Sequence, residues 1–216
     1  MNRPNALVFD LDGTLLDTLA SLASAFNRAL EQMGHPANPV ANYRNIIGDG
    51  ARNAACRALP PASQSENEIK HCLTLFREAY HQSWQTATIY EGINELLGSL
   101  PPEIPLAVLS NKDDLFTQKC VTHFFPDRFH LIVGASATIN HKPDPSGALY
   151  IAKQLQTKVD QLWMIGDTGT DMKAASQSGM TGIGVLWGFR DRNELANHGA
   201  SHIIEAPNHL LHLLEH

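Results

Sequence analysis

Six short apolar runs, most of them uninterrupted and rich in strand formers, constrain this chain's fold more than any other feature. Strands that are covered on both faces read as continuous apolar runs, whereas strands with one wet face alternate. Helical patterns occupy the stretches between these runs, and strand–helix alternation predicts an α/β fold with a parallel, Rossmann-like sheet. The expected strands are Ala6–Phe9, Leu106–Leu109, His130–Val133, Leu162–Ile165, Gly182–Leu186 and His202–Ile204, and the expected helices are Ile93–Leu100, Leu115–Phe124, Ser146–Gln156, Asp171–Ser178 and Pro207–Leu214.

One stretch interrupts this alternation, because no strand pattern is convincing between Asp17 and about Gln85. The segment "SLASAFNRALEQMG" carries apolar residues at helical spacing, and Gly34 is a typical stop. The segments "ARNAACRAL" and "SENEIKHCLTLFREAYHQSW" also favour helices. We therefore expect a small helical cap domain over residues 18–85, inserted after the first strand into a core formed by residues 1–17 and 86–216.

Composition and charge narrow the class of protein. A chain of 216 residues with 43% hydrophobic content can bury a full core, and its net charge of −6 argues against general nucleic-acid binding. No apolar stretch approaches the roughly 18 residues of a membrane span, and the N-terminal apolar run is too short for a signal peptide. Three well-separated cysteines fit a reduced compartment. We expect a cytoplasmic monomer or homodimer with no nucleic-acid or membrane partner.

Two further features carry little weight. The histidines are scattered, so they do not predict a metal site. The final Leu-Glu-His resembles the start of a purification tag, and we infer nothing from it.

Polar and charged residues gather just after the expected strands. Ligands in open parallel sheets bind outside the carboxyl ends of the strands, so these residues are expected to meet at one edge. None of the apolar runs carries such a group in its interior. The residues concerned are Asp10, Asp12, Gly13 and Thr14 after the first strand, Ser110, Asn111 and Lys112 after the second, Lys142 beyond the third, and Asp167 with Asp171 after the fourth.

These side chains suit a phosphate ester as substrate. Asp10, Asp12 and Asp167 offer hard oxygen ligands, which favour Mg²⁺ over Zn²⁺. A divalent cation would relieve the repulsion between carboxylates and offset charge on phosphoryl oxygens. Ser110 can donate a hydrogen bond to such an oxygen. Lys142 can reach both the phosphoryl group and a nucleophilic carboxylate, and charge stabilisation is the main demand of phosphoryl transfer.

Four motifs in order, "DLDGT", "LSNKDD", "HKPDP" and "IGDTGTD", resemble those of the haloacid dehalogenase superfamily. The expected helical insert matches the position of that superfamily's first-type cap. The cap segment "IIGDGARNAACRAL" further resembles phosphoglycolate phosphatases, whose cap often has a Gly-x-Gly followed by a helix. Asp12 favours an oxygen leaving group, because true haloacid dehalogenases lack this acid and phosphonatases carry a different residue there.

The resemblance implies a catalytic and metal-binding role for each aspartate. Asp10 would be the nucleophile that forms an aspartyl-phosphate, and Asp12 the general acid and then the general base. The Asp10 and Asp167 side chains and the Asp12 backbone carbonyl would bind Mg²⁺. Asp171 would hold the metal through water or orient Lys142; alternatively, it simply caps its helix.

The resemblance also implies how the phosphoryl group is held. Ser110, the Asn111 amide and Lys142 would grip it, and Thr14 would shape the loop after the nucleophile. A plainer interpretation of Ser110 and Asn111 is a cap for the helix expected at Leu115.

In the cap, Gly50 and Arg52 are candidates for substrate contact. The alternative there is a turn followed by a helix whose arginine faces water.

The function implied is a magnesium-dependent phosphatase of small phosphorylated metabolites, with 2-phosphoglycolate as the first substrate to consider. A phosphomutase of the β-phosphoglucomutase type would use the same nucleophile but would rebind the intermediate instead of hydrolysing it. A non-catalytic phosphate-binding regulatory protein would keep the fold without turnover. Retention of Asp10, Asp12, Lys142 and Asp167 argues against this last alternative.

Overall fold

The structure is a computed structural model that describes residues 3–215. It divides into two compact units, of which the first joins Met1–Leu16 to Ile89–His216 and the second is Asp17–Thr88. We call the first the core unit and the second the helical insert, and each is described by itself.

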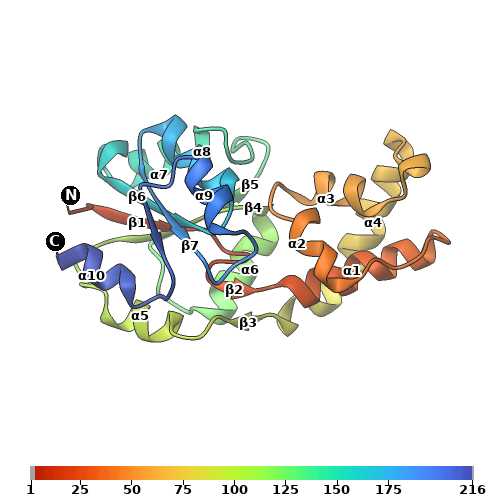
Figure 1. Cartoon of the computed structure of the whole chain (residues 1–216), viewed down its shortest axis with the longest axis horizontal. Helices are drawn as coiled ribbons and strands as arrows, with labels where there is room; N and C mark the ends of the chain where they lie inside the picture. Colours follow the sequence, from red (N-terminus) through yellow and green to blue (C-terminus); the bar gives the residue numbers. More distant parts are fainter. Residues whose placement is uncertain (1–2, 216) are drawn as a thin grey trace. The chain divides into compact units, whose positions relative to one another are not determined.

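The core unit contains a six-stranded parallel sheet, which confirms the predicted α/β fold (Figure 1). The strand order is β5-β4-β1-β6-β7-β8, so the first strand lies at the centre of the sheet. All four residues of β1 are fully buried, as a continuous apolar run between two layers requires. The strands are β1 (Ala6–Phe9), β4 (Leu106–Asp113), β5 (Leu131–Ala135), β6 (Leu162–Gly166), β7 (Thr181–Val185) and β8 (His202–Ile204).

Helices cover both faces of this sheet, with α7 and α8 on one face and α5 and α10 on the other (Figure 1). Ile151 of α7 and Ala175 of α8 join the buried cluster that contains Val8 of β1 and Met164 of β6. Burial of one aliphatic side chain of this size stabilises a fold by about 1.5–3 kcal/mol. The helices of the core unit are α5 (Ile93–Ser99), α6 (Asp114–Phe124), α7 (Ser146–Gln154), α8 (Gly169–Ser178), α9 (Arg192–Asn197) and α10 (His209–Glu215).

Strand β4 differs most from its predicted extent, because it continues to Asp113 and not only to Leu109. Ser110, Asn111 and Lys112 therefore lie within the strand and not after it. Their pairing with β5 is irregular, since the register shifts between Leu109 and Asp113. The predicted strand ends at Leu109 because the apolar run stops there, but the hydrogen bonds between strands do not require apolar side chains.

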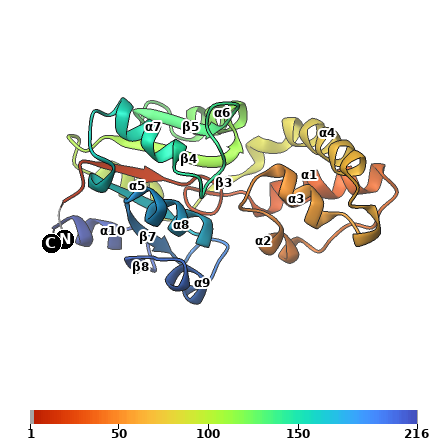
Figure 2. The same ribbon diagram turned by 90° about the horizontal axis from the view of Figure 1, so that it is seen from above.

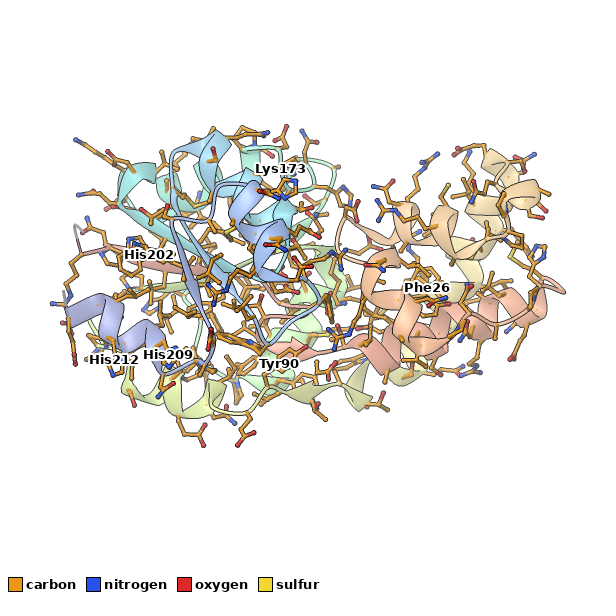
Figure 3. The ribbon with its side chains drawn as sticks, in the orientation of Figure 1. Phe26, Tyr90, Lys173, His202, His209 and His212 are labelled. Carbon is orange, nitrogen blue, oxygen red and sulfur yellow. The ribbon has the colours of Figure 1, made fainter. Side chains whose placement is uncertain are left out.

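The helical insert contains the three helices that the sequence predicts and one further short helix, α2, that was not predicted from the sequence (Figure 2). Its centre is aromatic: Phe26 stacks on Phe76 with ring centroids 3.9 Å apart and on Tyr43 at 6.1 Å. Figure 3 shows Phe26 enclosed by the helices of the insert. The helices are α1 (Leu19–Gln32), α2 (Tyr43–Ile46), α3 (Ala51–Ala58) and α4 (Glu66–Ser83), with short 3-10 turns at Val40–Asn42, Pro61–Ser63 and Trp84–Thr86.

Two very short strands connect the units and are absent from the sequence prediction. Strand β2 (Leu16–Asp17) pairs with β3 (Thr88–Ile89) in a sheet of their own. Two residues carry no periodicity, so a pattern cannot reveal such strands. Within residues 3–215, no helix has both the length and the apolar character needed to cross a membrane.

Candidate active site

Lys142 links two buried aspartates at the carboxyl edge of the sheet. Its Nζ donates hydrogen bonds to Asp10 Oδ1 at 2.6 Å, Asp171 Oδ1 at 2.6 Å and the Leu109 carbonyl oxygen at 2.8 Å. Asp10 follows β1 directly, and its backbone N–H donates to the Ile165 carbonyl of β6 at 2.8 Å. Lys142 and Asp10 are 4% and 6% exposed, so this ammonium group and its partners are shielded from water.

Asn111 fixes the backbone of Lys142. Its side-chain Nδ2 donates to the Lys142 carbonyl oxygen at 3.1 Å, and the Lys142 backbone N–H donates to Asn111 Oδ1 at 2.6 Å. The Asn111 side chain is therefore engaged in positioning the lysine. The alternative of a helix cap is not seen for either Ser110 or Asn111, because the N-cap residue of α6 is Asp113 and its side chain makes no capping hydrogen bond.

Asp171 caps α8 and contacts Lys142, which are two of the three roles that the sequence leaves open. Thr168 and Asp171 form a capping box at the start of α8, in which Asp171 Oδ2 accepts hydrogen bonds from the Thr168 backbone N–H at 3.0 Å and hydroxyl at 2.7 Å. Its other oxygen, Oδ1, accepts from Lys142. The capping hydrogen bonds at the start of α8 hold the Asp171 carboxylate in place, and this carboxylate orients Lys142.

Asp167 lies at the end of β6 and is completely buried. Its Oδ1 accepts a hydrogen bond from the Thr14 hydroxyl at 3.1 Å, and its Oδ2 accepts from the Phe189 backbone N–H at 2.8 Å. Thr14 thus shapes the loop after β1 by tying it to a second strand end. Each of these two hydrogen bonds to an Asp167 oxygen comes from an uncharged group, so neither donor neutralises the charge of the carboxylate.

Carboxylate oxygens of Asp10, Asp167 and Asp171 lie within 4.8 Å of one another. Burial raises the pKa of Asp10 to about 7, with the Lys142 charge opposing this shift and the Asp171 charge adding to it. Burial, followed by the charges of Asp10 and Asp171, also raises the pKa of Asp167 well above its usual value. A group of buried hard oxygen donors with excess negative charge fits a divalent cation such as Mg²⁺.

The surroundings of Lys142 keep its ammonium group charged. Burial by itself lowers the pKa of Lys142, but the charges of Asp10 and Asp171 and their hydrogen bonds more than offset burial, so the net shift is upward. A permanent positive charge next to Asp10 is thus built into the site. Such a charge would stabilise the phosphoryl oxygens of a substrate placed beside Asp10.

Asp12 has a lysine of its own. Lys112 Nζ donates to Asp12 Oδ2 at 2.6 Å and to Oδ1 at 2.9 Å, and the backbone N–H of Lys112 donates to Ser110 Oγ at 3.2 Å. Lys112 follows the predicted strand Leu106–Leu109, but no role for it was predicted from the sequence. A second lysine at the carboxyl edge was the available signal.

The segment after β7 supports Asp167 and the loop that follows β1, and no role for this segment was predicted from the sequence either. Trp187 Nε1 donates to the Thr14 carbonyl oxygen at 2.9 Å, and Phe189 supplies the N–H to Asp167. At Gly13, φ is +95°, and an added Cβ would lie 2.3 Å from Asp167 Oδ2. Glycine is therefore required at Gly13 both for its backbone conformation and for space. Position after a strand was again the signal that should have drawn attention.

Gly50 and Arg52 lie in the helical insert. Gly50 is the N-cap residue of α3 at φ +90°, and Arg52 is an exposed residue of that helix that pairs with Glu66. Their role in substrate binding stays a prediction.

The family model for haloacid dehalogenase-like hydrolases matches residues 7–185. A phosphoglycolate phosphatase of Colwellia psychrerythraea is 30% identical over 98% of this chain and 97% of its own, and one of Vibrio cholerae is 31% identical over 91% of each. A crystal structure of a candidate phosphoglycolate phosphatase from Lactobacillus delbrueckii subsp. bulgaricus superposes with a TM-score of 0.93 at 31% identity and covers 98% of each chain.

Proposed function

The chain is an enzyme of the haloacid dehalogenase-like hydrolase family, and from this membership we propose that it is a magnesium-dependent phosphatase of small phosphorylated metabolites. The family assignment confirms the resemblance drawn from the four motifs. The names of its relatives make 2-phosphoglycolate the first substrate to test. We retain the cytoplasm as its proposed location.

One observation carries the proposal: a buried ammonium group is held between Asp10 and Asp171 inside a cluster of aspartates. Lys142 lies 2.6 Å from an oxygen of each, and Asp167 completes the cluster. A nucleophilic carboxylate, a fixed positive charge and hard oxygen ligands at one point are what transfer of a phosphoryl group requires. Asp12, two residues after Asp10, adds a group that can move a proton.

The proposed reaction has two steps. In the first, an Asp10 oxygen bonds to phosphorus while the ester P–O bond breaks, and Asp12 gives its proton to the departing ester oxygen. In the second, a water oxygen bonds to phosphorus while the bond to Asp10 breaks; Asp12 takes the proton of that water, and inorganic phosphate leaves. Asp10 is restored, and Asp12 is again protonated for the next substrate.

The residues around this pair bind and orient the reacting groups. The Asp10 and Asp167 side chains and the Asp12 backbone carbonyl are the proposed ligands of Mg²⁺, and Asp171 either binds it through water or acts through Lys142. The bound ion would neutralise charge on the phosphoryl oxygens. Lys142, the Ser110 hydroxyl and the Asn111 backbone amide hold the same oxygens. Thr14 keeps the loop in register through Asp167.

The helical insert is proposed to choose the leaving group. Gly50 and Arg52 are the residues that we expect to contact it, and an Arg52→Ala variant should raise KM for the true substrate. A screen of phosphorylated metabolites by phosphate release, compared through kcat/KM, would identify that substrate.

The central test is hydrolysis of p-nitrophenyl phosphate with Mg²⁺. Asp10→Asn should abolish turnover while thermal unfolding shows a folded protein, whereas Asp160→Asn, a change at an exposed aspartate outside the site, should leave turnover intact. EDTA should stop the reaction. Unchanged turnover in Asp10→Asn would show that Asp10 is not the nucleophile. Full activity in EDTA would show that the reaction does not depend on a metal ion.

The same assay separates the two alternatives. A phosphomutase would need a bisphosphate activator and would release little phosphate. A regulatory protein would bind phosphate without turnover.

A further inference from the structure

The Asp12 side chain is held by a lysine that the family motifs leave without a role. Lys112 Nζ reaches both carboxylate oxygens, at 2.6 Å and 2.9 Å. The Lys112 and Asp12 side chains are 7% and 17% exposed, so the pair is largely shielded from water. Exposed ion pairs are worth little and hold no fixed geometry, but a shielded pair that engages both oxygens restricts how the carboxyl group can turn.

The backbone of Lys112 is itself fixed at the end of β4. Its N–H donates to Ser110 Oγ at 3.2 Å, and its carbonyl oxygen accepts from Thr117 Oγ1 at 3.1 Å. Thr117 is fully buried in α6. The ammonium group therefore extends from an anchored main chain, and it transmits that anchoring to Asp12.

Lys112 and Lys142 divide the carboxylates between them. Lys142 contacts Asp10 and Asp171, whereas Lys112 contacts Asp12. The nucleophile and the proton carrier are thus each aimed by a separate cation. Orientation matters most for the Asp12 carboxyl group, because this group has to face the leaving oxygen in one step and a water molecule in the next.

We propose that Lys112 is a positioning residue that holds the Asp12 carboxyl group in the orientation needed for both proton transfers. The proposal rests on the phosphatase function and deepens it. Without Lys112, the Asp12 side chain regains rotation about its two side-chain torsions. Proton transfer through Asp12 then becomes slow, while nucleophilic attack by Asp10 keeps its own support from Lys142.

The leaving group separates the two steps. With p-nitrophenyl phosphate, the P–O bond breaks as p-nitrophenolate departs, and this anion needs no proton. Hydrolysis of the aspartyl-phosphate still needs Asp12 to take a proton from water while the Asp10–phosphorus bond breaks. Loss of Lys112 should therefore slow the second step and spare the first. With an alkyl phosphate such as glycerol phosphate, both steps need Asp12, so both should slow.

The test is a stopped-flow comparison of wild type, K112M and K112R with p-nitrophenyl phosphate and Mg²⁺. K112M should release one p-nitrophenolate per site in a burst at the wild-type rate, then turn over at least about tenfold slower, because general acid–base catalysis contributes about 10²–10⁴-fold. Mass spectrometry should detect the accumulated phosphoenzyme. The kcat/KM for p-nitrophenyl phosphate should stay unchanged, and that for glycerol phosphate should fall. K112R should restore much of the turnover, since it also presents a cationic donor.

Dependence on Asp12 is the decisive control. In a D12N background, K112M should change neither the burst nor the steady-state rate further, because there is no carboxylate left to position. An independent loss in that background would overturn the proposal. If thermal denaturation shows that K112M is unfolded, K112Q replaces it in the same experiment, and the same results are expected.

An unchanged kcat with a raised KM would mean that Lys112 binds a substrate anion, and an equal fall in burst and steady-state rates without phosphoenzyme would mean a structural role; either result overturns the proposal. Absence of any wild-type hydrolysis would instead remove the phosphatase function on which it rests.

Discussion

Gly188→Ala should damage the proposed metal site without replacing any proposed catalytic or metal-binding residue, because the added methyl group would collide with the side chain of Asp167. A Cβ at Gly188 would lie 2.3 Å from Asp167 Cβ and 2.3 Å from the Gly13 carbonyl oxygen, whereas ordinary contacts begin at 3.4 Å. The Gly13 carbonyl oxygen belongs to the main chain, and Asp167 Cβ is bonded directly to the main chain, so neither atom is the flexible end of a side chain that could move aside. Each of the two contacts must lengthen by about 1.1 Å, which is the difference between 3.4 Å and 2.3 Å.

The expected magnitudes follow from that displacement. Overpacking of this kind costs about 1–3 kcal/mol, and each kcal/mol lowers Tm by about 2–4 °C in a chain of this size. A shift of about 1 Å in a catalytic group can cost about 100-fold in rate. We therefore expect a folded protein with Tm lowered by several degrees, a raised half-saturating Mg²⁺ concentration and kcat reduced by about tenfold or more.

The assay is a Mg²⁺ titration of p-nitrophenyl phosphate hydrolysis alongside thermal denaturation. Gly98→Ala is the matched control, because a Cβ there meets nothing within 4 Å and Gly98 lies within α5. That change should stabilise the protein by about 0.5–1 kcal/mol and leave kcat unaltered. A Gly188→Ala protein whose kcat and Mg²⁺ dependence stay within twofold of wild type would refute this account of the loop.

Three further outcomes are expected. Asn111→Ala should lower kcat by about tenfold with the fold retained, because it removes both side-chain hydrogen bonds that hold the Lys142 backbone; an unaltered kcat would contradict this positioning. In the native protein a thiol reagent should modify half-buried Cys56 but neither Cys72 nor Cys120, which are buried. Burial raises the pKa of Cys72 to about 11, so unfolding should become easier as pH rises above about 9, where the unfolded thiol ionises first. Cys72→Ala should remove most of that slope between about pH 9 and 10, whereas Tyr43, whose pKa burial raises to about 12, adds a slope of the same sign above pH 10. Chemical denaturation across this range measures both.

Local pattern was sufficient for the fold and for the presence of the motifs. Continuous apolar runs revealed a sheet that is buried on both faces, and helical spacing around Phe26 revealed the insert. Aspartates and lysines at strand ends could be assigned to one edge because parallel strands share their carboxyl edge. These inferences depend on periods of two or 3.6 residues, which a sequence displays directly.

Pattern failed where the determining contact lies elsewhere in the chain. Strands β2 and β3 are too short to show a period and exist because they pair with each other. The extension of β4 past Leu109 likewise depends on pairing with β5. Trp187 donates a hydrogen bond to the Thr14 carbonyl oxygen and Phe189 donates one to Asp167. The position of this segment after a strand places it at the carboxyl edge, but no local feature reveals which groups it contacts there.

The sequence by itself determined which chemical groups reach the edge of the sheet: carboxylates, lysines and hydroxyls placed after apolar strands. Only the tertiary structure decided how they are paired, with Lys142 between Asp10 and Asp171, and Lys112 on Asp12. The physical reason is range. Backbone periodicity is a local property, whereas the partner of a buried charge is whichever opposite charge folding brings within hydrogen-bonding distance, here from positions up to 132 residues away.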